Sequence, residues 1–248
     1  KKYAVAKELP EKQITVVYCD MEEKQRVLYD SWKRKIQQEI LTAIEEEGFL
    51  KSRMKILQGL MKLRQICNHP KLVDASFLGE SGKFNLLAQQ IEEVMEEGHK
   101  ILIFSSFVKM LHLFEKYFED RGVKYAYLDG STRKRQEEVE KFQNDPALKV
   151  FLISLKAGGL GLNLTAADYV FIVDPWWNPA AEMQAIDRTH RIGQDKKVFV
   201  YKAITKDSIE EKILELQESK KELVCNLITV EEGLFKRLGA KDIQKLFE

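Results

Sequence analysis

The chain has 248 residues, of which 44% are hydrophobic and 32% are charged, and its formal net charge is +1. A chain of this size buries roughly 70–75% of its unfolded surface, which is enough for one large domain with or without appendages. No apolar run approaches the roughly 18–20 residues needed to span a membrane. The near-neutral charge excludes a uniformly basic surface, so any nucleic-acid contact has to come from a local patch.

The cysteines indicate the redox compartment of the chain, and the amino terminus indicates whether a longer protein contains it. Cys19, Cys67 and Cys225 are odd in number, widely spaced and without a CxxC pair, which argues against a disulfide framework or a zinc site. We expect no metal site and a reduced, intracellular compartment: the cytoplasm or nucleoid of a bacterium, or the nucleus of a eukaryote. The start lacks an initiator Met and a signal-peptide core, so we expect a fragment of a longer protein.

The first third of the sequence predicts an antiparallel helical pair. The first helix has apolar residues at four-residue spacing, with Asp20 as its N-cap, Glu23 in a capping box and Gly48 just past its end. The second, about 51–67, has its apolar residues on one side and stops before Pro70.

From about Phe84 short apolar runs alternate with helical patterns. We predict strands at 101–106, 125–128, 149–154, 169–174 and 197–204, and helices at 84–97, 107–120, 132–143, 179–191 and 207–224. This alternation requires right-handed crossovers, so it predicts a parallel sheet covered by helices on both faces. In such folds function lies at the carboxyl ends of the strands.

The most distinctive stretches of the sequence all end or follow predicted strands. Ser105 and Ser106 end the first strand, and "DGSTRKR" (129–135) follows the second. "LKAGGLGLN" (155–163) follows the third, and "PWWNP" (175–179) follows the fourth. Because the carboxyl ends of parallel strands share one edge of a sheet, we expect these stretches to converge there.

Two of these stretches are candidates for phosphate contact. The segment 154–165 carries three glycines, which let the backbone approach an anion, and Lys156 favours this interpretation over that of a flexible loop. The basic run places Ser131 or Thr132 at a helix start, followed by Arg133. The run is either a solvated face or a grip on a nucleic-acid backbone.

The predicted helix 179–191 raises a similar choice. Gln184, Arg188 and Arg191 are spaced i, i+4 and i+7 and so share one face of that helix. Arginine is suited to bidentate phosphate binding, whereas an ordinary amphipathic helix would use the arginines in ion pairs with Asp187 or Glu182.

Before this helix come Trp176 and Trp177, of which we expect one to pack and one to face a ligand or partner. Asn178 suits the N-cap, Pro179 the first helical position and Gly193 the helix end.

A possible P-loop, "GESGKFN" (79–85), fails on its spacing. Only two residues separate Gly79 from Gly82, Phe84 stands where Ser or Thr would bind Mg²⁺, and no predicted strand precedes the motif. No Asp-Glu pair follows a predicted strand either. We therefore expect this chain, by itself, to be inactive in nucleoside triphosphate hydrolysis.

The strand-end stretches resemble motifs of the Swi/Snf-type DNA-translocating ATPases, within the superfamily-two helicases. "ILIFSSF" is similar to motif IV, "YLDGST" to the motif after it, "SLKAGGLGLNLTAADYVFIVD" to motif V, and "DPWWNPAAEMQAIDRTHRIGQ" to the Trp-Asn-Pro segment with motif VI. "LRQICNHP" resembles the end of the family's helical insertion, and "ELPEK" the link from the first lobe. The resemblance covers essentially the whole chain, and "DRTHRIGQ" and "AGGLGLNLT" are highly specific.

The resemblance implies an α/β fold, a RecA-like doubly wound parallel sheet with an N-terminal antiparallel helical hairpin and C-terminal helices. It divides the chain into a link from the missing first motor lobe (1–19), a helical insertion (20–80), the second RecA-like helicase lobe (81–206) and C-terminal brace helices that pack back on the lobes (207–248).

The resemblance also implies roles for single residues. Arg188 and Arg191 match the motif VI arginines that reach ATP held by the first lobe, and Gln184 matches the glutamine near the γ-phosphate. Gly161 and Asn163 match the nucleotide-facing part of motif V.

The DNA-facing candidates are strand-end residues: Ser131, Thr132, Arg133, Ser154, Lys156, Gly158 and Trp177. Two positions depart from the family pattern. Ser106 stands where the family more often has Gln, and Trp176 adds a second aromatic beside Trp177.

The implied function is that of the second motor lobe of an ATP-dependent double-stranded DNA translocase or remodeller. ATP and Mg²⁺ are expected to be held mainly by the first lobe of the same chain. The expected partners are double-stranded DNA, that lobe and an unidentified protein target, with no membrane. Three alternatives stay open: a strand-separating helicase of the same superfamily, an RNA-polymerase-associated translocase, and a stand-alone α/β domain that binds a phosphorylated ligand.

Overall fold

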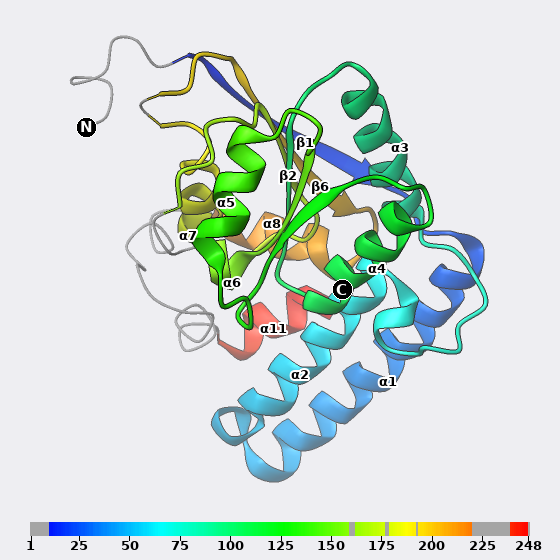
Figure 1. Ribbon diagram of the computed structural model, residues 1–248. Coiled ribbons are helices and arrows are strands. Elements are labelled where there is room, and N and C mark those ends of the chain that lie inside the picture. The colour runs from blue at the N-terminus through cyan, green and yellow to red at the C-terminus, as the bar shows by residue number, and fades with distance from the viewer. Residues whose placement is uncertain (1–9, 159–161, 177–178, 192, 220–238, 248) are drawn as a thin grey trace. The chain divides into compact units, whose positions relative to one another are not determined.

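The computed structural model of the chain describes residues 10–158, 162–176, 179–191, 193–219 and 239–247 (Figure 1). Its contacts divide into two compact units, which we describe separately. The sheet unit comprises Lys1–Val17, Leu87–Trp176 and Ala181–Ala203, and the helical unit comprises Tyr18–Leu86, Trp177–Ala180 and Ile204–Glu248. Within the described ranges, no helix is both long enough and apolar enough to cross a membrane.

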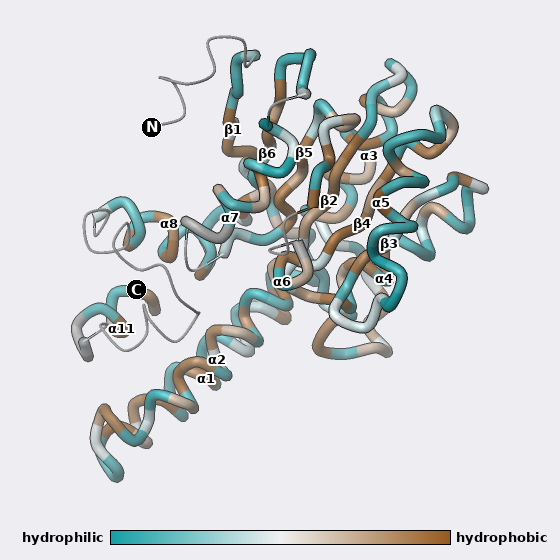
Figure 2. Tube along the Cα trace, turned by 60° about the vertical axis from the view of Figure 1, so that its left-hand side comes forward, coloured by the Kyte–Doolittle hydropathy of each residue, from teal (hydrophilic) through white to brown (hydrophobic). Residues whose placement is uncertain are grey.

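The sheet unit contains the predicted parallel sheet. Its strands are β1 (Lys12–Cys19), β2 (Ile101–Ser105), β3 (Tyr125–Leu128), β4 (Val150–Ser154), β5 (Tyr169–Ile172) and β6 (Val198–Thr205). They lie in the order β1-β6-β5-β2-β4-β3, which can be followed in Figure 2. The five strands predicted from apolar runs are confirmed, with ends within two residues of those expected.

Helices flank this sheet. α5 (Arg135–Asn144) and α7 (Pro179–Ile186) lie on one side of it, and α3 (Gly82–Glu96) and α4 (Val108–Glu119) lie on the other (Figure 1). Every residue of β2 and β4 is buried, as continuous apolar runs predict for strands covered on both faces. The RecA-like doubly wound fold is therefore confirmed.

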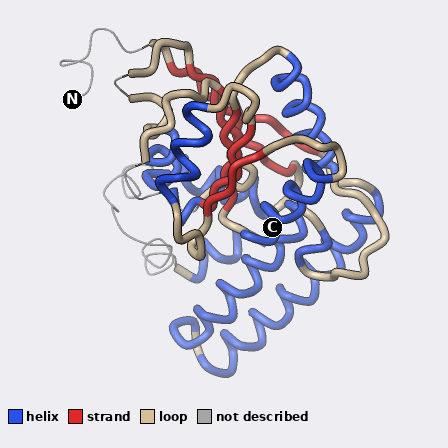
Figure 3. Tube along the Cα trace, viewed as in Figure 1, coloured by secondary structure: helices blue, strands red, loops and turns tan. Residues whose placement is uncertain are grey.

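The helical unit is built on the predicted pair, α1 (Glu23–Glu47) and α2 (Phe49–Asn68), which lie side by side in Figure 3. Gly48 joins them with a φ of +80°, which favours glycine. At Gly59 an added Cβ would come within 2.4 Å of Ile36 Cγ2, so a side chain there would force the helices apart. α8 (Ile209–Ser219) and α11 (Ala240–Phe247) add apolar residues to the same core, including Ile213 and Leu246. The predicted helix 207–224 is thus described only as far as Ser219.

Two details at the start of the chain differ from the sequence prediction. The N-cap of α1 is Glu22 rather than Asp20, and Gln25 rather than Glu23 closes the capping box, with its Oε1 accepting a bond from the Glu22 amide at 3.4 Å. Strand β1 was not predicted, since this stretch was assigned to the link. It is a half-exposed edge strand, and such strands lack the continuous apolar run that identifies buried ones.

The rejected P-loop motif is a structural element of the helical unit. The side chain of Lys83 is fully buried, and its Nζ donates to Glu210 Oε2 at 2.6 Å and to Asn68 Oδ1 at 3.1 Å. Lys83 is therefore committed to a buried ion pair instead of a phosphate, which agrees with the rejection of this motif.

His69, which follows α2, leads to a prediction about pH. Its Nδ1 accepts a bond from the Lys71 amide at 3.1 Å and so caps the 3₁₀ helix η2 (Pro70–Leu72). Desolvation by burial, with a contribution from the Lys71 charge, lowers the pKa of His69 to about 4. The unfolded chain binds this proton near pH 6.5, so His69 contributes its full stability above that pH and loses it as the pH falls towards 4.

We expect the free energy of unfolding to fall by up to about 3 kcal/mol from this residue between pH 6.5 and 4. Urea titrations across this range measure the effect. His69→Asn, which keeps an acceptor but does not titrate, should flatten the pH dependence. An unchanged slope in His69→Asn would contradict the assignment.

Candidate nucleotide and nucleic-acid site

The strand ends meet at one edge of the sheet, as the sequence predicts. Parallel pairing places Ser105 of β2 opposite Ser154 of β4. The same pairing sets Leu128 opposite Ile153, at the ends of β3 and β4, and Phe104 opposite Ile172, at the ends of β2 and β5. The segments that follow these four strands therefore leave the sheet at one level.

Asp174 holds the ends of β2 and β5 together. It is fully buried two residues after β5, and its Oδ2 accepts a bond from Ser105 Oγ at 2.5 Å. Its Oδ1 accepts bonds from the Ser106 hydroxyl and from the Ser106 amide, the latter at 3.1 Å. Ser106, which replaces the family's more frequent Gln, is thus engaged in this contact. Asp174 was not among the predicted site residues, although a carboxylate directly after a buried strand is a usable signal.

The segment after β3 is a turn rather than a helix start. Ser131 donates to Asp129 Oδ1 through its amide at 2.8 Å and its hydroxyl at 2.7 Å, and Thr132 Oγ1 accepts from the Asp129 amide at 3.0 Å. Burial raises the pKa of Asp129, but hydrogen bonds to its carboxylate from Ser131, Tyr127 and Thr132 outweigh burial and leave the pKa below its ordinary value. The prediction of a helix start at Ser131 or Thr132 is wrong, because both residues bond to Asp129 and α5 begins at Arg135.

One basic side chain of this turn has no partner within the described part of the chain. Arg135 is turned back onto the loop, with Nε donating to the Thr132 carbonyl at 3.2 Å and a terminal nitrogen donating to the Gly130 carbonyl at 3.3 Å. Lys134 pairs with Glu137. Arg133 is exposed and has no hydrogen-bond or ion-pair partner among the described residues.

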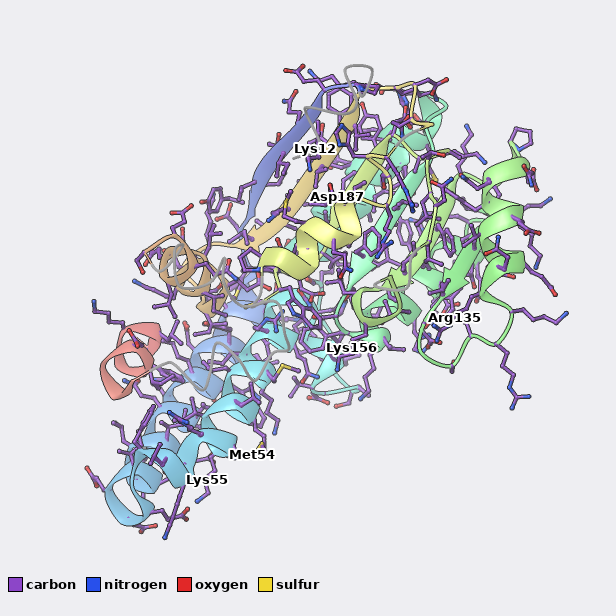
Figure 4. The ribbon with its side chains drawn as sticks, turned by 90° about the vertical axis from the view of Figure 1, so that its left-hand side faces the viewer. Lys12, Met54, Lys55, Arg135, Lys156 and Asp187 are labelled. Atoms are coloured by element: carbon purple, nitrogen blue, oxygen red, sulfur yellow. The ribbon has the colours of Figure 1, made fainter. Side chains whose placement is uncertain are left out.

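The segment after β4 begins with a short helix, α6 (Leu155–Gly158). Ser154 is buried, whereas Lys156 is exposed and has no partner within the described part of the chain. Figure 4 shows Lys156 and Arg135 on these neighbouring elements of the edge. Gly158 is the last residue of α6, Gly161 lies outside the described residues, and Asn163 is exposed.

The segment after β5 confirms that one tryptophan packs. Trp176 is buried in the core of the sheet unit, and its amide donates to Glu182 Oε1 at 2.5 Å. The carboxylate of Glu182, itself buried, also bonds to Lys202. Trp177 lies outside the described residues, so its expected exposure to DNA stays a prediction.

The predicted helix 179–191 is five residues shorter than expected. Pro179 is its first residue, as predicted, but α7 ends at Ile186. The amides of Arg188 and Thr189 bond three residues back, to the carbonyls of Ala185 and Ile186, which tightens the chain into a turn. We call residues 187–191 the arginine turn. The prediction that Gln184, Arg188 and Arg191 form one helical stripe is therefore wrong.

The side chains of this region nonetheless differ in availability. Gln184 on α7 and Arg191 on the arginine turn are exposed, and neither has a partner among the described residues, whereas Arg188 is half-buried. Asp187 Oδ1 pairs with Lys12 Nζ at 3.4 Å, and Glu182 pairs with Lys202. Lys12 and Asp187 are labelled in Figure 4.

Comparison with known families agrees with this geometry. The helicase conserved C-terminal domain matches residues 82–193, and the SNF2-related domain matches residues 1–72. The fold and the matched ranges define the class as the carboxyl-terminal lobe of a superfamily-two helicase. The chain belongs to the Swi/Snf-type ATPases of that class.

Individual relatives cover the whole chain. An uncharacterized ATP-dependent helicase of Mycoplasma genitalium is 37% identical over 249 residues, which is 100% of this chain and 24% of that protein. The Sulfolobus solfataricus SWI2/SNF2 ATPase C-terminal domain has a TM-score of 0.77 and 32% identity, covering 96% of this chain and 99% of that one. The core of that ATPase in complex with double-stranded DNA has a TM-score of 0.81 and 33% identity, over 99% and 52% of the two chains. The chain thus spans about a quarter of the length of the curated relative.

The role of Asp174 leads to a stability prediction. Asp174→Ala would leave the buried Ser105 hydroxyl and Ser106 amide without their acceptor, and we expect a loss of about 2–4 kcal/mol. The exposed Asp195→Ala is the control and should stay within about 0.5 kcal/mol of the parent. Urea unfolding of both variants measures this difference, and equal stabilities would show that Asp174 does not hold the edge together.

Proposed function

We propose that this chain is the second motor lobe of an ATP-dependent double-stranded DNA translocase or remodeller. The observation that carries the proposal is the alignment of four strand ends at one edge, together with the exposed side chains of Arg133, Lys156 and Arg191 in the segments that follow β3, β4 and β5. The likeness to an ATPase core in complex with double-stranded DNA supports the choice of that nucleic acid. In this proposal a first lobe of the same chain completes the motor.

The nucleotide side of the site consists of Arg188, Arg191 and Gln184, with Gly161 and Asn163. Guanidinium and amide N–H groups fit phosphate oxygens, and the exposed Arg191 and Gln184 have no competing partner among the described residues. ATP supplies the phosphoryl group whose transfer drives the motor. Arg191 would neutralise the charge that spreads over the γ-phosphoryl oxygens, and it cannot deprotonate while doing so.

We assign no Mg²⁺ ligand to this chain. Within the described residues, no three His, Cys, Asp or Glu side chains gather in a way that could hold a metal ion. The buried carboxylate of Asp174 is taken up by Ser105 and Ser106. The proposal therefore leaves the metal to the first lobe.

The DNA side of the site consists of two basic side chains with their neighbours. Arg133 follows the turn that carries Ser131 and Thr132, and Lys156 follows Ser154 on α6 before Gly158. Arg133 and Lys156 are exposed and available, so they suit contacts to the phosphate backbone, which position a protein without reading sequence. Trp177 is proposed to lie beside the DNA track, by its match to the family motif.

The first test of this function is the substitution of Arg191. In the two-lobed protein, Arg191→Ala should lower DNA-stimulated turnover by at least roughly 10³, because an arginine finger contributes about 10³–10⁵. DNA affinity should stay near the parental value. Arg191→Lys should not restore turnover, because a point charge lacks the planar two-pronged grip.

Arg121→Ala is the matched control for this experiment. Arg121 forms a surface ion pair with Glu92 at 2.8 Å, an interaction worth about 0–1 kcal/mol, and its removal should leave turnover unchanged. If Arg191→Ala keeps more than about a tenth of the parental turnover, a loss of 1.4 kcal/mol or less, the arginine-finger role is excluded.

The second test concerns the basic strand-end residues. Lys156→Ala and Arg133→Ala should each weaken binding of the two-lobed protein to DNA of any sequence. Each should also reduce the slope of log affinity against log salt by about one unit, since one phosphate contact is lost. Fluorescence anisotropy across a salt series measures both quantities. Lys124→Ala, which precedes β3 and so lies at the opposite end of that strand, is the control. If both test variants keep the parental DNA affinity and the parental salt slope, Lys156 and Arg133 are solvated surface residues that do not contact DNA.

A further inference from the structure

Gln194, the last residue of "DRTHRIGQ", is buried and reaches two separate segments. It is only 5% exposed, and its Nε2 lies 2.8 Å from the Ala167 carbonyl oxygen and 3.1 Å from that of Thr165. The same nitrogen lies 3.2 Å from the carbonyl oxygen of Thr189 in the arginine turn. Its Oε1 accepts a bond from the Lys196 amide at 2.9 Å, which fixes the orientation of the side-chain amide.

The backbone of Gln194 holds a second point of the arginine turn. Its amide donates to the carbonyl of Arg191 at 2.9 Å and closes a tight turn. Gly193 within that turn has a φ of +100°, a backbone conformation that residues other than glycine rarely adopt. Gln194 therefore meets the arginine turn through both its side chain and its main chain.

A third hydrogen bond holds the main chain at Arg188. The amide of Leu164 donates to the carbonyl of Arg188 at 3.1 Å. The carbonyls of Arg188, Thr189 and Arg191 are thus each held by residues 164–167 or by Gln194. The amides of Arg188 and His190 tie the turn to the end of α7 as well, through the carbonyls of Ala185 and Ile186. Residues 164–167 and Gln194 therefore add a second attachment, on the carbonyl side of the turn.

We propose that Gln194 is a positioning residue that couples the glycine-rich segment to the arginine turn. Its amide locks residues 165–167, which follow the proposed DNA-contacting Lys156, to the turn that carries Arg188 and Arg191. A shift of residues 164–167 on DNA binding is thereby passed to the main chain of the turn that carries the two arginines. The inference rests on the proposed function, since it assigns to Gln194 an effect that acts only through these arginines.

The chain offers a matched control in Gln143. Its Oε1 accepts a bond from the Ala166 amide at 2.8 Å, and its Nε2 lies 3.4 Å from Thr165 Oγ1. Gln143 therefore holds the same loop, but no described bond joins it to the arginine turn. A role in loop stability is shared by both glutamines, whereas a role in positioning the arginines belongs to Gln194 alone.

The experiment compares Gln194→Leu and Gln143→Leu in the two-lobed protein. A misplacement of about 1 Å costs on the order of 10²-fold in rate, so Gln194→Leu should lower DNA-stimulated kcat about 10- to 100-fold. KM for ATP and Kd for DNA should stay within about twofold, because a positioning defect acts on the transition state rather than on ground-state binding. Gln143→Leu should keep kcat within about twofold, because none of the described bonds of Gln143 reaches the arginine turn.

A double-substitution cycle separates positioning from general stability. With Arg191→Ala already present, Gln194→Leu should lower the single-turnover rate by a clearly smaller factor than in the parent, since one of the two arginines that it positions is gone. A structural role would instead lower the rate by the same factor in both backgrounds.

Thermal melting checks that each variant is folded. If Gln194→Leu is unfolded at the assay temperature, Gln194→Asn, which is one methylene shorter, replaces it and should show a loss in the same direction.

The outcomes separate the inference from the proposed function. If Arg191→Ala abolishes turnover while a folded Gln194 variant keeps parental kcat, the coupling role alone is overturned. Equal losses from Gln194 and Gln143 variants, or full additivity with Arg191→Ala, overturn it as well. If Arg191→Ala keeps parental turnover, the arginine-finger function fails, and the role of Gln194 fails with it.

Discussion

The parallel register of strands β2 to β5 is the constraint on which the candidate site depends. It sets Ser105 against Ser154 and brings segments from four separate strands to one edge. The buried Asp174 then ties the ends of β2 and β5 through Ser105 and Ser106. The sheet thus brings the separate motifs onto one surface, for which we propose a nucleotide side and a DNA side.

Much of this arrangement could be predicted because buried parallel strands leave a strong sequence signal. Continuous apolar runs identified β2 through β6, and the parallel topology then implied a shared edge for the segments that follow them. The helical pair was equally visible from its four-residue spacing and from Gly48, whose positive φ the turn requires. One of the two neighbouring tryptophans was expected to pack, because both are difficult to bury together, and Trp176 is buried.

What could not be predicted depends on tertiary hydrogen bonds. The arginine spacing fits a helix, but the carbonyls of Arg188 and Thr189 bond to Leu164 and Gln194, and the helix ends at Ile186. Likewise Ser131 and Thr132 look like helix caps, yet both bond to Asp129 in a turn. In each case a hydrogen-bond partner outside the helical pattern decides the backbone conformation, so the spacing of these residues did not predict their geometry.

The central claim is that this chain provides one side of an ATP site whose other side belongs to a separate lobe. The most direct test is DNA-stimulated ATP hydrolysis by the purified chain alone, measured beside a protein in which the chain follows a first motor lobe. The account predicts turnover by the two-lobed protein and none above background by the chain alone, because the P-loop lysine and the Mg²⁺ carboxylates supply most of the electrostatics of phosphoryl transfer. Robust hydrolysis by the rigorously purified chain would contradict it.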